Sequence, residues 1–190
     1  KARIYDDLMV RHWDYWDDGS YRHIFTGEIE DGKLVNIKDI TGADAEYDTP
    51  LAPFFDGSEI AWHPLSNYIA YTCKPLTGTK YAVSTDSAIF VHNVKEDVAF
   101  NININHSEKF EGYDKYPVWS PDGSKIAFRS QRRAGNEADK ERLFIYYLQS
   151  GEVKELTANF DYNATNVVWT DENTLCFIAP IEATHQICRV

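Results

Sequence analysis

Short blocks of alternating hydrophobic and polar residues run along this chain, and one block occurs three times. The copies are Ile60–Tyr71, Pro117–Phe128 and Val167–Phe177. Each copy has an apolar run that ends in tryptophan, then a polar stretch, then a second apolar run that ends in an aromatic residue. Alternation with a period of two predicts strands, and a polar stretch between two strands predicts a hairpin. The sequence therefore predicts three related β-hairpins.

The polar stretch of the second copy shows why the chain reverses there. Pro121 presets φ, Asp122 can hydrogen-bond its own backbone, and Gly123 tolerates a positive φ. The other two copies are degenerate versions of this turn, and the third is one residue shorter. Matched tryptophans and turns in three copies argue against unrelated hairpins of a β-sandwich.

Further strands are expected between the hairpins. They cover 23–29, 88–94 and 143–148, and each is followed by a tight turn and one more short strand, at 34–37, 98–102 and 153–156. One unit therefore has four antiparallel strands in about 50 residues, which is the sequence signature of a propeller blade.

The predicted fold is all-β, a partial β-propeller of about three and a half four-stranded antiparallel blades. We expect a partial blade at 1–45, complete blades at 46–107 and 108–158, and a partial blade at 159–190. In the first partial blade, Leu8–Trp13 is the expected second strand. Closed propellers typically have about four to eight blades, so a closed ring is not expected from this chain. Its exposed sheet edges predict a tendency to self-associate.

Charge and hydropathy exclude two classes of partner. The 190 residues carry a formal net charge of −11, and the densest basic cluster, Arg129, Arg132 and Arg133, is diluted by nearby acidic residues. Nucleic-acid binding needs clustered positive charge, so we expect no nucleic-acid partner. No apolar run approaches the roughly 20 residues that span a bilayer, so we expect no membrane partner either.

The sequence contains no recognisable catalytic or metal motif. Gly-x-Ser-x-Gly, a phosphate-binding loop and Gly-x-Gly-x-x-Gly are absent. The histidines stand singly, and Asp14, Asp17 and Asp18 lack the spacing of a calcium loop. Cys176 and Cys188 either face each other across a hairpin or fill strand positions as small apolar groups, and we favour the second interpretation. We therefore expect no catalytic residue, no metal and no cofactor.

Long connections gather at one end of the predicted blades. In a four-stranded antiparallel blade, the connections after strands two and four lie at the same end, and here these are the long ones: 14–22, 42–59, 73–87 and 129–142. Long loops commonly carry binding residues. The candidate binding residues on this face are Arg11, His12, Trp13, Asp14, Trp16, Arg132, Arg133 and Glu137.

The stretch 11–19 has two interpretations. Tryptophan, tyrosine and arginine are enriched at binding hot spots, so it is either a polar-aromatic contact surface or a strand end whose aromatic rings pack on the neighbouring blade. The second interpretation is slightly favoured.

The repeat resembles a known one. Trp119–Phe128, which reads WSPDGSKIAF, and its copies at Trp62 and Trp169 are similar to the WD-like propeller repeat of TolB-type proteins and of the prolyl oligopeptidase family of serine peptidases. Two further segments, Arg11–Phe25 and Tyr47–Pro50, resemble the dipeptidyl-peptidase and acylaminoacyl-peptidase branch of that family. The likeness covers nearly the whole chain.

This resemblance implies a propeller segment that gates and orients short peptides for a C-terminal hydrolase domain of the same parent chain. The hydrolase domain would hold the catalytic residues, so none is assigned here, and no cofactor is implied. By analogy, the parent would be periplasmic or otherwise exported. The alternatives are a stand-alone TolB-like propeller that acts as a protein-interaction scaffold and, more remotely, a propeller that binds glycans or surfaces.

Overall fold

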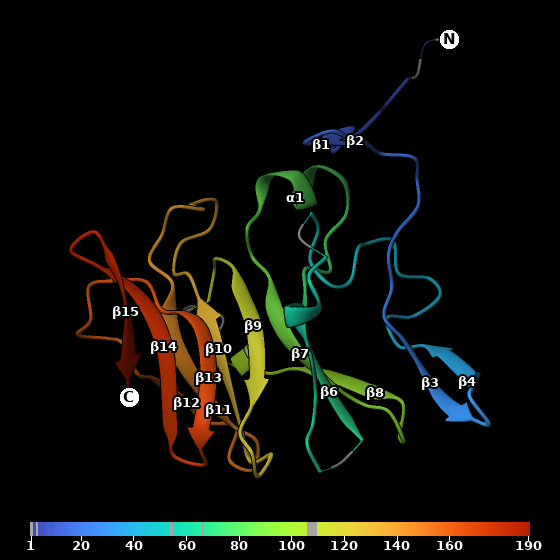
Figure 1. Cartoon of the computed structure of the whole chain (residues 1–190). Helices are drawn as coiled ribbons and strands as arrows, with labels where there is room; N and C mark the ends of the chain where they lie inside the picture. Colours follow the sequence, from blue (N-terminus) through green and yellow to red (C-terminus); the bar gives the residue numbers. More distant parts are fainter. Residues whose placement is uncertain (1, 3, 54, 66, 106–109) are drawn as a thin grey trace.

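The computed structural model describes residues 2, 4–53, 55–65, 67–105 and 110–190, and its regular secondary structure consists mostly of antiparallel strands (Figure 1). The first complete sheet consists of β5 (Ile60–Trp62), β6 (Tyr68–Cys73), β7 (Ala88–Asn93) and β8 (Val98–Asn101). The second consists of β9 (Asp114–Trp119), β10 (Lys125–Ser130), β11 (Arg142–Tyr147) and β12 (Val153–Glu155). In both sheets the strand order in space follows the order in sequence, as in a propeller blade.

Smaller sheets flank this pair. The three-stranded sheet is β13 (Thr165–Asp171), β14 (Thr174–Ile181) and β15 (Thr184–Arg189). The two-stranded ones are β1 (Arg11–His12) with β2 (Tyr15–Trp16), and β3 (Phe25–Glu30) with β4 (Lys33–Asp39). Two short helices, the 3-10 helix η1 (Gly57–Glu59) and α1 (Gly78–Val83), lie in the connections before β5 and β7. The chain is thus an all-β partial propeller, as predicted, and no sheet formed by the described residues closes on itself.

The prediction of a strand at Leu8–Trp13 is wrong. Only Arg11 and His12 are extended, and they pair with Trp16 and Tyr15 in a hairpin of their own instead of joining β3. The hairpin is closed locally, because the backbone N–H of Asp17 donates to the carbonyl of Val10 at 3.1 Å. Trp13 at its tip has a φ of 49°, a left-handed conformation that reverses the chain. Local closure therefore replaces the expected pairing with β3.

The repeated hairpins keep tryptophan in the same register. Trp62 lies opposite Ile69, Trp119 opposite Ile126, and Trp169 opposite Leu175. The turn at 120–124 is held as expected, since the Asp122 carboxylate accepts from the backbone N–H of Ser124 at 3.1 Å. Equivalent residues therefore occupy equivalent places in the three sheets.

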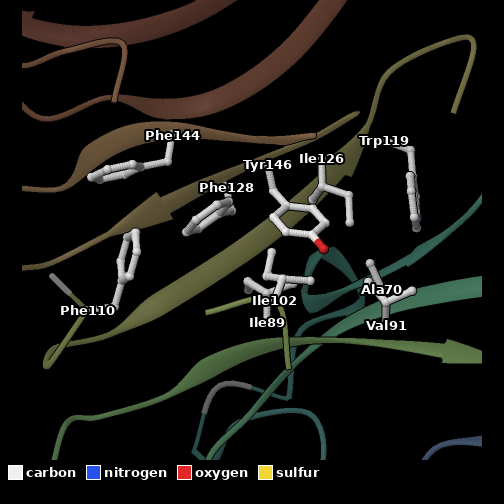
Figure 2. Packing of buried hydrophobic residues seen from close by; sticks show 10 residues of the cluster. All are labelled: Ala70, Ile89, Val91, Ile102, Phe110, Trp119, Ile126, Phe128, Phe144 and Tyr146. Atoms are coloured by element: carbon white, nitrogen blue, oxygen red, sulfur yellow. The ribbon is translucent and has the colours of Figure 1, made fainter. Parts of the chain in front are cut away.

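The largest core lies between the two complete sheets (Figure 2). The rings of Phe128 and Phe144 stack with centroids 5.7 Å apart, and Phe110 meets Phe144 edge-on at 5.0 Å. Ile89 and Val91 of β7 close this cluster from the first sheet. Burial of large apolar side chains is the main stabilising contribution, and aromatic pairs add to it.

Two further cores continue the stack in sequence order. Leu143 of the second sheet packs with Leu175 and Phe177 of the three-stranded sheet. On the other side of the first sheet, Ile24 and Ile40 pack on Ile69 and Tyr71. Each sheet is therefore packed against the next, and the β3-β4 pair is attached through the residues that flank it.

The two ends of the sheets differ. The connection that contains α1 and the connection between β10 and β11 lie at one end, with the β1-β2 hairpin beside α1, whereas the short turns of the hairpins lie at the opposite end (Figure 1). The first end carries the candidate site.

Candidate binding site

A cavity of about 540 Å³ lies between the N-terminal hairpin, the connection 46–55 and the start of α1. Aromatic rings form much of its wall: Tyr5, Tyr15, Trp16, Tyr21, Phe55 and Tyr81. Carboxylates from several segments also line it: Asp7, Asp17, Asp18, Glu46 and Asp48. Its volume is in the range of small-molecule sites, about 300 to 1,000 Å³.

The N-terminal wall is attached to α1 through Asp7. Its carboxylate accepts from the backbone N–H of Thr79 at 2.9 Å and also from the Thr79 hydroxyl. These hydrogen bonds hold the pKa of Asp7 below its usual value, because they favour the charged form. A residue at the start of the chain is thereby held against a helix that follows β6.

The opposite wall is held by Arg22 and Asp48. The carboxylate of Asp48 accepts from the backbone N–H of Arg22 at 2.8 Å, and the Arg22 guanidinium lies 3.5 Å from the centroid of the Phe55 ring. The backbone N–H of Thr49 also donates to the Arg22 carbonyl at 2.8 Å. These contacts position the 46–55 connection without regular secondary structure.

Negative charge converges on Tyr21. Burial raises the pKa of its hydroxyl, and the carboxylates of Glu46, Asp17 and Asp48 raise it further because they oppose a phenolate charge. Burial also raises the pKa of Asp48. Carboxylates beside aromatic faces favour a cationic group, through charge attraction and cation–π contact.

Lys74 holds α1, which forms one wall of the cavity, in place. Its buried ammonium group donates to the carbonyls of Tyr81 at 2.9 Å and Ser84 at 2.8 Å, and it lies 3.7 Å from the Tyr81 ring centroid. Burial lowers the pKa of Lys74 to about 8, although the carboxylate of Glu137 opposes the shift. Lys74 therefore ties the end of α1 to the end of β6.

Three of the candidate residues predicted in the hairpin line the cavity: Arg11, His12 and Trp16. The Arg11 guanidinium lies 5.7 Å from the Trp16 ring centroid, and its Nε donates to the Trp13 carbonyl at 2.5 Å. Trp13 and Asp14 lie at the hairpin tip and do not line the cavity. Trp13, Tyr15 and Trp16 are exposed, so these rings do not pack as a strand end on a neighbouring sheet. The contact-surface interpretation fits this placement better.

The predicted residues of the 129–142 connection lie outside the cavity. Arg133 pairs with Asp139 at 3.0 Å, and the backbone N–H of Arg132 donates to the same carboxylate. Burial lowers the pKa of His12, and the charge of Lys74 lowers it further, whereas the Glu137 carboxylate opposes this shift. Arg132, Arg133 and Glu137 are all absent from the cavity lining.

Sequence reasoning missed the 46–55 wall. Glu46, Asp48 and Phe55 belong to a connection without periodicity, and the signals that pointed to it were its length and the family resemblance of Tyr47–Pro50. The described residues contain no group of three or more His, Cys, Asp or Glu that could hold a metal ion. Among the helices of the same residues, none is both long and apolar enough to cross a membrane. Cys176 and Cys188 are free, and their registers place them opposite Arg189 and Phe177, respectively.

The stacked four-stranded sheets and the repeated tryptophan hairpins define a partial β-propeller. Over all 190 residues the chain is 37% identical to a dipeptidyl-peptidase 5 of Porphyromonas gingivalis. It is 34% identical over 144 residues to that of Porphyromonas endodontalis and 27% over 183 residues to that of Aspergillus fumigatus. The predicted relationship to the dipeptidyl-peptidase branch is therefore confirmed.

The matches cover most or all of this chain but only part of each relative. They span 100%, 76% and 90% of the chain, and 27%, 20% and 25% of the three relatives. Among solved structures, TolB from Acinetobacter baumannii aligns with 69% of the chain and 28% of its own, with a TM-score of 0.48 and 21% identity. No family model matches the sequence.

Proposed function

We propose that this chain is the propeller segment of a serine dipeptidyl-peptidase and that its cavity binds the amino-terminal end of short peptides. The segment would orient and gate these peptides for a hydrolase domain of the same protein, which would supply the nucleophile. The relationship to dipeptidyl-peptidases over the whole chain supports the class of enzyme. The observation that carries the binding role is the convergence of three carboxylates on Tyr21 in an aromatic cavity.

The chemistry of a peptide amino terminus matches this cavity. Its ammonium group is a cation at neutral pH, so carboxylates and aromatic faces attract it, whereas the side chains of a short peptide contact apolar rings. Glu46 and Asp48 come from one wall and Asp17 from the other, so a bound ammonium group would connect the two walls. The hairpin and the α1 segment flank the cavity, and their separation would limit the size of the peptide that enters.

The test is binding of trialanine and of N-acetylated trialanine to the 190-residue chain, measured by isothermal titration calorimetry. Acetylation removes the positive charge and leaves the rest of the peptide intact. We expect the free-amine peptide to bind about five- to thirtyfold more tightly, because one close charge interaction contributes about 1 to 2 kcal/mol in a partly exposed site. The double variant Glu46→Gln/Asp48→Asn should lose this preference.

Glu152→Gln is the matched control, because it removes one carboxylate from an exposed turn at the opposite end of the second sheet. It should leave the preference for the free amine unchanged. Equal binding of the two peptides, or no loss in the double variant, would contradict the proposal. Such a result would favour the scaffold alternative, in which the exposed hairpin rings bind a protein.

A further inference from the structure

Consecutive residues at the end of β6 contact the two connections that form walls of the cavity. Thr72, Cys73 and Lys74 are all buried, although Thr72 and Lys74 carry polar groups and Lys74 an ammonium group. Buried polar groups are costly unless they are hydrogen-bonded. The partners of these residues therefore determine which segments are held against the end of the strand.

The 46–59 connection is attached to the first two of these residues. The Thr72 hydroxyl donates to the carboxylate of Glu59, and both side chains are completely buried. The thiol of Cys73 lies 3.7 Å from the hydroxyl of Thr49, which is also completely buried. The middle and the end of this connection are thus both held to β6.

The α1 connection is attached to the third residue. The ammonium group of Lys74 donates to the carbonyls of Tyr81 and Ser84, at the C-terminal end of the helix. Among the described residues, the α1 connection and the 46–59 connection share one hydrogen bond, a long one of 3.5 Å from the Tyr81 hydroxyl to the Ala52 carbonyl. Each wall therefore depends mainly on its own attachment to β6.

The two walls present different chemistry to the cavity. The 46–59 connection contributes the carboxylates of Glu46 and Asp48 to the lining. The lining residues of the α1 connection carry no charge, and they are Leu76, Thr77, Gly78 and Tyr81. The first wall can therefore recognise a positive charge, whereas the second can recognise only shape and uncharged groups.

The second sheet holds its own long connection in the same way. Gln131 has the same position in the second repeat as Lys74 in the first, and it is also buried. Its side-chain amide donates to the carbonyls of Glu137 at 3.0 Å and Asp139 at 3.1 Å, within the 129–142 connection. A buried donor after the second strand is therefore a recurring anchor for the connection that follows.

On the basis of the peptide site proposed above, we infer that Thr72 and Lys74 are positioning residues with separate tasks. Thr72 places the wall whose carboxylates attract the ammonium group of the peptide. Lys74 places the wall whose uncharged surface contacts the rest of the peptide. Neither residue lines the cavity, so each acts through the segment that it holds. Binding groups need such support, because a small displacement removes much of their contribution.

The test compares trialanine and N-acetylated trialanine in isothermal titration calorimetry at pH 7. Thr72→Val keeps the shape of the side chain but removes the hydroxyl, so the preference for the free amine should fall at least about threefold as the carboxylates are displaced. Lys74→Met should weaken the binding of both peptides by the same factor, at least about threefold, and leave the preference unchanged. A loss of stability alone lowers the number of folded molecules and does not change the preference.

Conservative variants show whether the hydrogen bond itself is responsible. Thr72→Ser keeps the hydroxyl and should restore the preference of the wild type. Glu59→Gln removes the charge from the same hydrogen bond but keeps its shape, so it should show the selective loss to a smaller extent. The second variant also tests the proposal if Thr72→Val does not fold.

Gln131→Met is the matched control for Lys74→Met, because it removes an equivalent buried donor from a connection outside the cavity. It should leave the affinity for both peptides unchanged. If Thr72→Val weakens the two peptides equally, or if Gln131→Met weakens them as much as Lys74→Met does, the assignment of separate tasks is wrong.

Hydrogen–deuterium exchange without peptide separates this inference from the proposed function. Thr72→Val should speed amide exchange in 46–59, and Lys74→Met should speed it in 78–84, because each variant loosens one wall. Faster exchange of both walls in either variant would contradict separate attachment. A wild-type chain that binds neither peptide would contradict the proposed function instead, whereas the exchange pattern would still decide whether Thr72 and Lys74 hold separate walls.

Discussion

The paired sheets β5–β12 and the segment before them contain similar strands in different surroundings. In the sheets, Ile126, Phe128 and Leu143 are completely buried. In the β3-β4 pair, Phe25, Ile29 and Leu34 are exposed over more than half of their surface. The strand pattern alone does not bury a side chain, because burial needs a neighbouring sheet on the same face. The complete sheets have such neighbours, whereas the β3-β4 pair is attached mainly through Ile24 and Ile40.

The residues of the candidate binding site lie mainly in the less packed region. The cavity is lined mostly by residues before β5, and these lie in connections and in the small β1-β2 hairpin. The sheets contribute the frame to which this segment is attached, through Lys74 and the start of α1. Rigid repeats with a site on their irregular connections are a common division of roles in proteins.

The largest expected effect compares two phenylalanines, one from each region. Phe128→Ala should lower the free energy of unfolding by about 3 to 5 kcal/mol, because it removes a fully buried ring from the core between the complete sheets. Phe25→Ala should cost less than about 1 kcal/mol, because that ring is 60% exposed. Urea unfolding followed by tryptophan fluorescence measures both. Similar losses of unfolding free energy in Phe128→Ala and Phe25→Ala would show that the two regions are equally well packed, which would contradict the difference described above.

The next effect compares two glycines with nearly the same backbone conformation. Gly123 has a φ of +73°, and a Cβ there would lie 2.1 Å from Nε2 of His63, whereas Gly32 has a φ of +74° with no heavy atom within 4 Å. Gly123→Ala should therefore cost about 2 to 3 kcal/mol in the same unfolding assay, from backbone strain plus the clash. Gly32→Ala should cost about 1 kcal/mol from strain alone.

His63→Ala supplies the control for this pair. Combined with Gly123→Ala, it should recover the part of the loss that comes from the clash, so the double variant should lose less than the sum of the two single ones. The turns of neighbouring sheets would then be in close contact, as the 3.1 Å distance from His63 Nε2 to the Gly123 carbonyl indicates. If Gly123→Ala and Gly32→Ala lower the free energy of unfolding equally, the His63 side chain moves aside at no cost.

The repeat was readable from the sequence because its determinants are local. The tryptophans and the turn at 120–124 fix a hairpin within about a dozen residues, and the same register follows in each copy. The strand predicted at 8–13 was wrong because local pairing also decides the structure there. This stretch has a strand-like pattern, but pairing with Tyr15 and Trp16 in the β1-β2 hairpin closes a shorter loop than pairing with β3 does.

The cavity depends on contacts between distant segments, which periodicity does not reveal. Asp48 holds the backbone of Arg22, and Asp7 holds that of Thr79, across 26 and 72 residues of sequence. Asp7 belongs to no recognisable motif, and the segment Tyr47–Pro50 around Asp48 indicated a family resemblance but no binding role. The aromatic and charged residues of the hairpin were visible as unusual composition, which explains why Arg11, His12 and Trp16 were predicted and Glu46 and Asp48 were not.

The smallest expected effect concerns Lys74, where the two regions meet. Its pKa in the folded chain is lowered to about 8 from the usual 10.5, mainly because burial disfavours the charged amine. Below about pH 8 the folded and unfolded chains both hold this proton. Between about pH 8 and 10.5 only the unfolded chain keeps it, so this residue makes the free energy of unfolding rise with pH in that window.

Comparison with a variant isolates this contribution. Burial also raises the pKa of the neighbouring Tyr81 and Cys73, and these groups make stability fall at high pH, so the wild-type curve alone mixes opposite slopes. The difference in unfolding free energy between the wild type and Lys74→Met should grow in favour of the wild type by about 1 to 2 kcal/mol across the window. Lys80→Met, which removes an exposed lysine from α1, is the matched control. If the difference in unfolding free energy between the wild type and Lys74→Met does not change with pH, the amine of Lys74 remains hydrated in the folded chain. In that case α1, which forms one wall of the cavity, is held to the sheets more loosely than the buried contacts of Lys74 indicate.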